Sequence, residues 1–281
     1  MAEFCTYETA WCPGCGNFVI LECLKKALEE LGLENKDVLL AAGIGQAAKI
    51  PQYIEANQFC GLHGRALPAA AAAKMANDRL TVVVSTGDGD SYGEGGNHFI
   101  HNIRRNVNIA HFVHDNQIYG LTKGQASPTS GLGMHTGVQP DGNINQPFNP
   151  ILMALAAGAG FVARGFTGKK DHLVGLMKQA IAYDGYALID ILQPCVSFNK
   201  TNTFAWYNQR VYALEGDYDA KDKIGAMVKA MEFGEKIPIG VIYNQQMPSF
   251  NEKNEVLKQV GVLADHKTDA AVVEKLIEAF I

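Results

Sequence analysis

Oxygen-bearing side chains follow two apolar runs in the first half of the chain. Gly87-Asp88-Gly89 ends a β-branched run, and Asn116 comes after 26 further residues, just past the next apolar run. Mg²⁺ prefers oxygen ligands, which the Asp88 carboxylate, the Asn116 amide and the carbonyl group of Ile118 can supply. The glycines allow the backbone to approach phosphate oxygens, and a following helix offers free N–H groups to an anion. We therefore predict a magnesium and diphosphate site.

A Gly-Asp-Gly sequence alone is also compatible with an ordinary glycine-rich turn. The spacing to Asn116 makes the pattern more specific, because ligands bind at the carboxyl ends of parallel strands. Thr122, a few residues further on, is expected to contact the diphosphate. Asp90 is interpreted as a residue at the start of a helix, because Asp and Ser favour that position.

Three cysteines have positions that suit a metal centre. Cys12 and Cys15 precede a predicted helix, whose N–H groups and dipole stabilise thiolates. Cys195 follows a predicted strand, so it should lie at the same sheet edge as the diphosphate site. A thioredoxin-like dithiol is the alternative for Cys12 and Cys15, but residues 1–10 supply no strand before it. Spacing does not separate zinc from a 4Fe-4S cluster, since both take four thiolates.

Alternating strands and helices must position these residues. The alternation predicts an α/β fold with a mainly parallel sheet and helices on both faces. Residues 116–150 have little periodicity and are expected to form a long functional or disordered loop. Helices are predicted over residues 18–31, 68–77, 95–105, 150–158 and 169–183, and strands over residues 38–42, 80–85, 107–114, 161–164 and 187–192.

We divide the chain near residue 197. Residues 1–197 are expected to form the diphosphate-binding α/β domain with the N-terminal cysteine segment. Residues 198–281 are expected to form a C-terminal extension that packs on this domain or on a partner, with helices near 219–233 and 268–280. The sequence contains no internal repeat.

Composition excludes several classes of function. The net charge is −5, without a long basic run, so nucleic-acid binding is not expected. No stretch of about 18 apolar residues predicts a membrane span. The acidic N-terminus does not resemble a signal peptide, and a cytoplasmic location is expected. In that reducing environment, six cysteines indicate metal binding or catalysis before disulfides.

Several motifs together resemble the β subunits of the 2-oxoacid:ferredoxin oxidoreductases, which are thiamine-diphosphate-dependent enzymes. The likeness extends over roughly residues 5–212. The motifs are Trp11-Cys-Pro-Gly-Cys-Gly, Gly43-Ile-Gly, Leu62-His-Gly-Arg-Ala-Leu-Pro, Gly87-Asp-Gly-Asp, Gly95-Gly-Asn-His-Phe, Asp115-Asn-Gln-Ile-Tyr-Gly-Leu-Thr, Gly124-Gln-Ala-Ser-Pro-Thr and Gln193-Pro-Cys.

The resemblance implies the thiamine-diphosphate-binding fold and the oxidative decarboxylation of a 2-oxoacid. Coenzyme A would take the acyl group, and ferredoxin would take the electrons. Removal of electrons requires a nearby acceptor, which favours a 4Fe-4S cluster over zinc. In this superfamily a second α/β domain supplies the glutamate that contacts the aminopyrimidine ring. Because this chain has no repeat, an α subunit would have to provide that domain.

One position departs from the family pattern. The family usually has a third cluster cysteine directly after Gly-Ile-Gly, where this chain has Gln46. Cys60 is the expected substitute as the fourth ligand. The alternatives are a three-cysteine cluster with another or open fourth site, and a degraded or zinc-filled site.

Two further residues have candidate roles by resemblance. His63 is expected to hydrogen-bond the substrate or an intermediate, and equally suits a structural role in its loop. Lys123 would pair with the distal carboxylate of a dicarboxylic substrate, which favours 2-oxoglutarate over pyruvate. The alternative is a solvated lysine. His111 and His114 lie in an apolar strand and are expected to be buried, neutral and on one side of it.

Two other functions remain open from the sequence. One is a thiamine-dependent decarboxylase or synthase subunit without redox chemistry. The other is a non-catalytic member that binds only metal or a partner.

Overall fold

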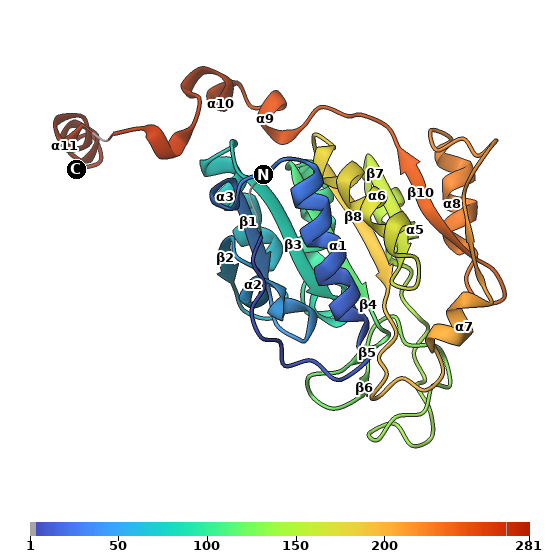
Figure 1. The fold of residues 1–281 in the computed structure, drawn as a ribbon. Coiled ribbons are helices and arrows are strands. Elements are labelled where there is room, and N and C mark those ends of the chain that lie inside the picture. The colour runs from blue at the N-terminus through green and yellow to red at the C-terminus, as the bar shows by residue number, and fades with distance from the viewer. Residues whose placement is uncertain (1–3, 268) are drawn as a thin grey trace.

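The apolar runs of the sequence form the middle strands of an eight-stranded sheet. The computed structural model describes residues 4–267 and 269–281. The strand order is β2-β1-β3-β4-β8-β7-β10-β9 (Figure 1). The strands are β1 (Val38–Ala42), β2 (Asn57–Cys60), β3 (Thr81–Gly87), β4 (Ile109–Asp115), β7 (Phe161–Phe166), β8 (Tyr186–Leu192), β9 (Val211–Ala213) and β10 (Ile237–Asn244).

Six strands, from β2 to β7 in the sheet order, are mutually parallel. β10 pairs with β7 in the antiparallel direction, and β9 pairs with β10 in parallel. The mainly parallel sheet is therefore confirmed. β10 comes from the segment after residue 197, so that segment contributes to the main sheet. The proposed domain boundary itself stays a prediction.

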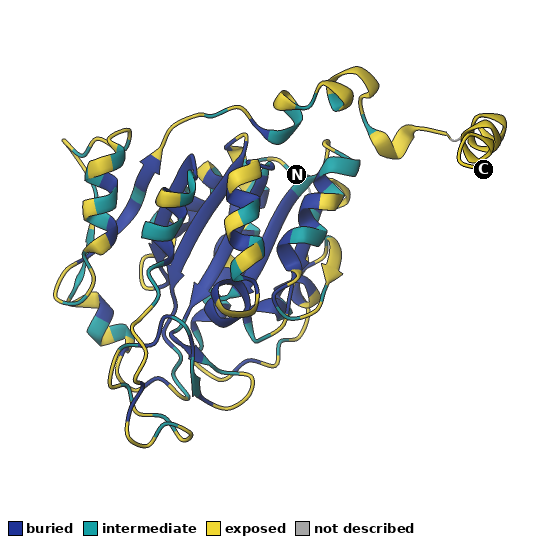
Figure 2. Ribbon diagram, turned by 180° about the vertical axis from the view of Figure 1, so that it is seen from behind, coloured by how far each residue is buried: buried dark blue, intermediate teal, exposed yellow. Residues whose placement is uncertain are grey.

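Helices cover both faces of the sheet, as predicted (Figures 1 and 2). Alternate residues of each strand point to opposite faces, and two separate apolar clusters form there. The helices of one face are α1 (Gly16–Glu30) and α6 (Lys170–Ala182). Those of the other face are α3 (Ala66–Ala76), α4 (Gly96–Arg105), α5 (Pro150–Ala157) and α8 (Lys223–Met231).

The remaining elements are short or lie outside the two helical layers. After β10 the chain runs past one end of the sheet and projects away from it (Figure 1). In the described residues, no helix is long and apolar enough to span a membrane. These elements are α2 (Ile50–Tyr53), β5 (Ile118–Tyr119), β6 (Gln125–Ala126), α7 (Phe204–Asn208), α9 (Phe250–Lys253), α10 (Glu255–Val260) and α11 (Ala270–Glu278).

The carboxyl ends of β3 and β4 lie side by side. Their register pairs Gly87 with His114, so the segments that follow the two strands begin next to each other. β3 leads into a π-helical turn, Gly89–Glu94. β4 leads into the long loop, which is mostly irregular apart from the β5–β6 hairpin. Irregular backbone at the carboxyl edge of a parallel sheet is the usual place for a ligand.

Candidate active site

Asp88 is held from the side by the long loop. It is the residue just before the π-helical turn, and it is 1% exposed. Its Oδ2 atom accepts hydrogen bonds from the hydroxyl groups of Ser127 and Thr129, the latter at 2.7 Å. Burial raises the pKa of the Asp88 carboxyl group, and the two hydroxyl groups act in the opposite direction. The loop thereby fixes the carboxylate that the sequence proposes as a metal ligand.

Asn116 follows β4 directly and is also held in place. Its side-chain oxygen accepts a hydrogen bond from the N–H group of Ile118 at 3.0 Å, an Asx-type turn. Its main-chain oxygen accepts one from the side chain of Asn199 at 3.0 Å. Gln117, between the two, has a positive φ of 58°. The turn therefore brings Asn116 and Ile118 to the same place.

One cavity at this edge brings most of the predicted cofactor residues together. Gly89 lies against the ring of Tyr119, where a Cβ atom would overlap a ring carbon, so a side chain is excluded. Lys123 does not line this cavity; it is exposed and has a positive φ of 73°. The predicted residues that line the cavity are His63, Gly87, Asp88, Gly89, Asn116, Ile118 and Thr122.

The donor types of this cavity fit Mg²⁺ on a diphosphate. One carboxylate, one amide oxygen and one carbonyl oxygen form the oxygen set that this ion takes alongside phosphate oxygens. In the part of the chain that the structure describes, no three His, Cys, Asp or Glu side chains gather closely enough to hold a metal ion. The predicted set contains only Asp88 of these types, so the site depends on the diphosphate for further ligands.

Buried charges that the sequence analysis missed lie behind Asp88. Asp115 accepts a hydrogen bond from the N–H group of Gln117, and its carboxylate lies 2.8 Å from the hydroxyl group of Thr129. Burial, with Asp190 and Asp88 nearby, raises the pKa of Asp115 well above its ordinary value. Arg164, 2% exposed, and Asp190 line a neighbouring cavity with Asp115. In the sequence, only the position of Asp115 directly before Asn116 indicated that this acid could belong to the site.

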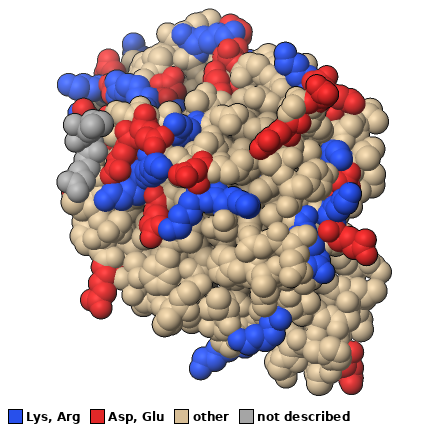
Figure 3. Space-filling view, turned by 45° about the vertical axis from the view of Figure 1, so that its right-hand side comes forward, with Lys and Arg blue, Asp and Glu red and all other residues tan. Residues whose placement is uncertain are grey.

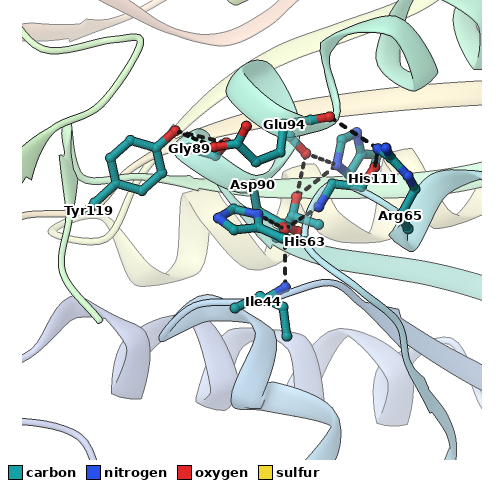
Figure 4. Close-up of polar contacts among 11 residues, drawn as sticks. Ile44, His63, Arg65, Gly89, Asp90, Glu94, His111 and Tyr119 are labelled. Atoms are coloured by element: carbon teal, nitrogen blue, oxygen red, sulfur yellow. Dashed lines mark hydrogen bonds and ion pairs between the residues drawn. The ribbon is translucent and has the colours of Figure 1, made fainter. Parts of the chain in front are cut away.

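Asp90 lies at the start of a helical turn, as predicted, but its side chain has a further role. It is the second residue of the π-helical turn and is 3% exposed. Its Oδ1 atom accepts hydrogen bonds from the N–H groups of Ile44 and Gly64, and lies 2.7 Å from His63 Nδ1 (Figure 4). Asp90 therefore ties together the loops after β1 and β2 rather than capping a helix. No local pattern indicates this role, because these partners are 26 to 46 residues away.

Of the four predicted cluster cysteines, Cys12, Cys15 and Cys195 lie near one another, but in the described part of the chain they are not gathered closely enough to form a metal-binding group. Cys15 directly precedes α1. Gln193, which follows β8, donates a hydrogen bond to the Cys15 sulfur atom at 3.6 Å. A Cβ atom on Gly16 would lie 2.7 Å from Gln193, so the glycine permits this close approach. Burial is the main cause that raises the pKa of Cys15 to about 11, with smaller contributions from Cys195 and Cys12. A metal would have to displace that thiol proton.

The order of the strands does not favour Cys60 as the fourth ligand. It ends β2 at the edge of the sheet, and three strands separate β2 from β8, which leads to Cys195. At about 4.8 Å per strand, the two strand ends are about 19 Å apart, too far for ligands of one cluster. Gln46 is closer to the cysteine segment, because its main-chain oxygen accepts a hydrogen bond from the Trp11 indole at 2.9 Å. The side-chain oxygen of Gln46 is buried without a hydrogen-bond partner.

His111 and His114 are buried, as predicted, but they face opposite sides of β4. His111 hydrogen-bonds Tyr186 on the side of α4, whereas His114 hydrogen-bonds Asn17 of α1. The prediction of a shared side was wrong because a separation of three residues along a strand reverses the face. Burial lowers the pKa of each imidazole to about 3, which keeps both neutral.

Comparisons with known proteins agree with this arrangement. The family described as "Thiamine pyrophosphate enzyme, C-terminal TPP binding domain" matches residues 39–191, more than half of the chain. The chain thus belongs to the thiamine pyrophosphate enzymes. A second family, the C-terminal part of the pyruvate ferredoxin oxidoreductase beta subunits, matches residues 195–259.

Comparison with individual relatives shows which thiamine pyrophosphate enzymes this chain resembles in sequence. A 2-oxoacid:ferredoxin oxidoreductase subunit beta from Saccharolobus solfataricus is 45% identical over 86% of this chain and 84% of that protein. The 2-oxoglutarate oxidoreductase subunit KorB of Mycobacterium tuberculosis is 40% identical over 83% of this chain and 59% of its own length. Within the thiamine pyrophosphate enzymes, this chain is therefore a member of the β subunits of the 2-oxoacid:ferredoxin oxidoreductases.

A solved structure supports the same fold and family. The 2-oxoglutarate:ferredoxin oxidoreductase from Magnetococcus marinus, with 2-oxoglutarate, coenzyme A and succinyl-CoA bound, superposes with a TM-score of 0.90. The sequence identity is 36%, and the match covers 96% of this chain and 92% of that chain. The predicted fold class is thus confirmed by the sheet topology and by this likeness.

Proposed function

We propose that this β subunit, together with an α subunit, catalyses the oxidative decarboxylation of a 2-oxoacid with coenzyme A. The products are acyl-CoA, CO2 and reduced ferredoxin. The observation that carries this proposal is the cavity at the carboxyl ends of β3 and β4, where Asp88, Asn116 and Ile118 converge. Such a set suits a magnesium ion bound to a diphosphate.

In this proposal Asp88, Asn116 and Ile118 hold Mg²⁺, while the backbone at Gly87 and Gly89 approaches the diphosphate. Thr122 lines the same cavity, and its exposed hydroxyl group, which donates to the side chain of Gln125 in this structure, would turn to a phosphate oxygen. Bound thiamine diphosphate supplies the carbanion chemistry that releases CO2 from a 2-oxoacid. The protein contributes orientation and a partly enclosed environment.

For the electron acceptor we propose a 4Fe-4S cluster held by Cys12, Cys15 and Cys195. The two strand-end segments that carry Asn116 and Cys195 are adjacent, because β4 and β8 are neighbours in the sheet. A cluster there would be close to the cofactor cavity, as electron transfer requires. With these three cysteines as ligands, the fourth site would be open or taken by a non-cysteine ligand.

For the substrate we propose 2-oxoglutarate in preference to pyruvate. The Magnetococcus protein has 2-oxoglutarate bound, and the mycobacterial relative is named for it. Lys123 is exposed, two residues beyond Leu121, which lines the cavity. Its ammonium group is therefore free to pair with the distal carboxylate of a dicarboxylic substrate.

Exposed apolar residues at the site end of the molecule support an α-subunit partner. Leu62 is 76% exposed and Ile144 87%, both in loops beyond the carboxyl ends of the strands. Leu121, Leu132 and Val138 of the long loop are exposed as well. In Figure 3, charged side chains gather over the upper part of one face, with broad uncharged areas below. Large apolar side chains in such a position typically contact another protein. A cytoplasmic location and ferredoxin as the electron partner are part of this proposal.

The test is an anaerobic assay of the co-purified α and β subunits. With 2-oxoglutarate and coenzyme A, the complex should reduce a viologen dye, and the β subunit alone should have negligible activity. CO2 release without dye reduction would favour a non-redox decarboxylase or synthase. Absence of both reactions with a panel of 2-oxoacids would favour a non-catalytic member of the family.

A further inference from the structure

Three loops of the active-site edge meet at a single carboxylate oxygen. Ile44 follows β1, His63 and Gly64 follow β2, and Asp90 follows β3. Asp90 Oδ1 accepts hydrogen bonds from the N–H groups of Ile44 at 3.0 Å and of Gly64 at 2.7 Å. His63 Nδ1 lies 2.7 Å from the same oxygen (Figure 4).

The surrounding backbone is shaped to admit this carboxylate. A Cβ atom on Gly43 would overlap Asp90 Oδ2, so the glycine leaves the necessary space. Gly64 has a φ of +71°, and a Cβ atom there would overlap the backbone of Glu94. Both glycines therefore allow the loops to close around Asp90.

The hydrogen-bond pattern defines how His63 carries its proton. Two main-chain N–H groups already point at Asp90 Oδ1, so this oxygen acts as an acceptor, and the imidazole must donate to it from Nδ1. In neutral His63 the Nε2 atom is then unprotonated. Nε2 makes no hydrogen bond within the described chain. The side chain is 37% exposed and lines the same cavity as Asp88 and Asn116.

We propose that Asp90 is a positioning residue that orients His63 and fixes its neutral tautomer, with Nε2 presented to the cavity as a hydrogen-bond acceptor. His63 then accepts a hydrogen bond from an O–H or S–H group of the reacting molecules. This role rests on the proposed function, because it assigns the cavity to 2-oxoacid and coenzyme A chemistry. An Asp–His pair of this kind is a common way to orient a catalytic imidazole.

The other ionisable groups around His63 come from the same edge. Tyr119 of β5 packs edge-on, with the ring centres 6.2 Å apart. Its hydroxyl group donates to Glu94, and Arg65 donates to the main-chain oxygen of Glu94. The loop after β1 contributes no ionisable side chain at residues 44–47. Asp90 is thus the carboxylate in direct contact with the imidazole.

The first test measures the tautomer itself. In the full-length chain labelled with ¹⁵N-histidine, His63 should show a protonated Nδ1 and an unprotonated Nε2 at pH 8. The His63→Asn variant identifies the signal. In Asp90→Ala, which removes the acceptor oxygen, the fixed tautomer should give way to a mixture. An Nε2-protonated His63 in the unmodified chain, or an unchanged tautomer in Asp90→Ala, would overturn the proposal.

The second test measures steady-state kinetics of the assembled complex. Asp90→Ala should lower kcat by about 100-fold, the lower end of what a positioned acid–base group contributes, with a smaller change in KM. His63→Asn keeps a donor for Asp90 but lacks Nε2, so it should lower kcat at least as far.

Glu94→Gln is the matched control, since it removes a carboxylate of the same helical turn that does not contact His63. It should keep the kcat of the unmodified complex. Equal thiamine diphosphate binding in all variants would exclude a folding defect. An unchanged kcat in Asp90→Ala would reject the positioning role. A complex without oxidoreductase activity would instead reject the proposed function, while the tautomer measurement would still decide the relation between Asp90 and His63.

Discussion

Asp88 and Asp115 lie against the same hydroxyl group, that of Thr129, at 2.7 and 2.8 Å. One hydroxyl group has one hydrogen and can donate to only one of two acceptors. Both carboxyl groups are buried, at the ends of neighbouring strands, and burial raises the pKa of each. The hydroxyl group of Thr129 therefore links the candidate metal ligand Asp88 to a second buried acid, Asp115.

Replacement of the Thr129 hydroxyl group should lower the stability of the folded chain. Thr129→Val leaves two buried acceptors without their shared donor, so the free energy of unfolding should fall by about 1–3 kcal/mol. Urea unfolding of the β subunit measures the change. Thr129→Ser, which keeps the hydroxyl group, should restore most of the stability. A valine variant as stable as the unmodified chain would show that the contact contributes nothing.

The magnesium site predicts a loss of coenzyme binding in Asp88→Asn. Outer-sphere partners of metal ligands typically contribute 10- to 100-fold to affinity, so loss of a charged ligand should weaken uptake of thiamine diphosphate by on the order of 100-fold or more. Calorimetry of the assembled complex at saturating Mg²⁺ measures this. Asp141→Asn, at an exposed position of the long loop, is the control. Comparable affinities for the two variants would contradict the site.

The placement of the cysteines predicts which of them hold iron. Cys12→Ser and Cys195→Ser should lose iron and the broad absorbance near 400 nm in anaerobically purified complex. Cys60→Ser should retain both, because three strands separate it from Cys195. Iron content and the spectrum are measured together. Loss of iron in the Cys60 variant alone would mean that the cluster is assembled differently.

Lys123 is expected to select the substrate. Lys123→Ala should raise the KM for 2-oxoglutarate by a factor on the order of 10 relative to that for pyruvate, since one charge-assisted hydrogen bond is lost. Steady-state assays with both oxoacids measure the ratio. Lys200→Ala removes another exposed lysine of a neighbouring loop and should leave the ratio unchanged. Equal effects of Lys123→Ala on both substrates would remove this residue as the selector.

The two buried histidines predict a loss of stability in acid. The pKa of His111 is about 3 in the folded chain and about 6.5 when exposed, so only the unfolded chain takes up its proton between these values. Stability from this group is therefore present above pH 6.5 and is lost as the pH falls toward 3. Each such group contributes up to about 1.4 kcal/mol per pH unit.

His111→Gln tests this slope. Between pH 6 and pH 4, its free energy of unfolding should depend on pH less steeply than that of the unmodified chain, by about 1.4 kcal/mol per pH unit. Urea titrations at several pH values give the comparison, in which the contributions of the buried aspartates cancel. Identical slopes would mean that His111 is already protonated in the folded chain.

The sequence predicted the parallel strands well because their residues are apolar, β-branched and bounded by glycine. It missed β10, since Pro238 and Gly240 interrupt its apolar run and suggest a turn. It missed β2 because all four of its residues are exposed at the sheet edge. Short strands of this kind are defined by their neighbours rather than by their own pattern.

For the site, the ligands on adjacent strand ends could be proposed because each follows its strand directly. The contacts of Asp90 could not be predicted, because they join loops that are distant in sequence. They also depend on glycines at positions where a Cβ atom would clash with a neighbouring residue. The position of Cys60 could not be foreseen for a related reason. Its distance from Cys195 is set by the order of the strands, which a count of residues along the chain does not reveal.

The antiparallel pairing of β10 with β7 has a consequence for any shortened form of this subunit. A chain cut after residue 197 would lack β10 and leave β7, buried along its whole length, as an uncovered apolar border. Such a border readily pairs with strands of other molecules. The fragment that contains the whole cofactor cavity should therefore aggregate on expression, whereas the intact chain should not.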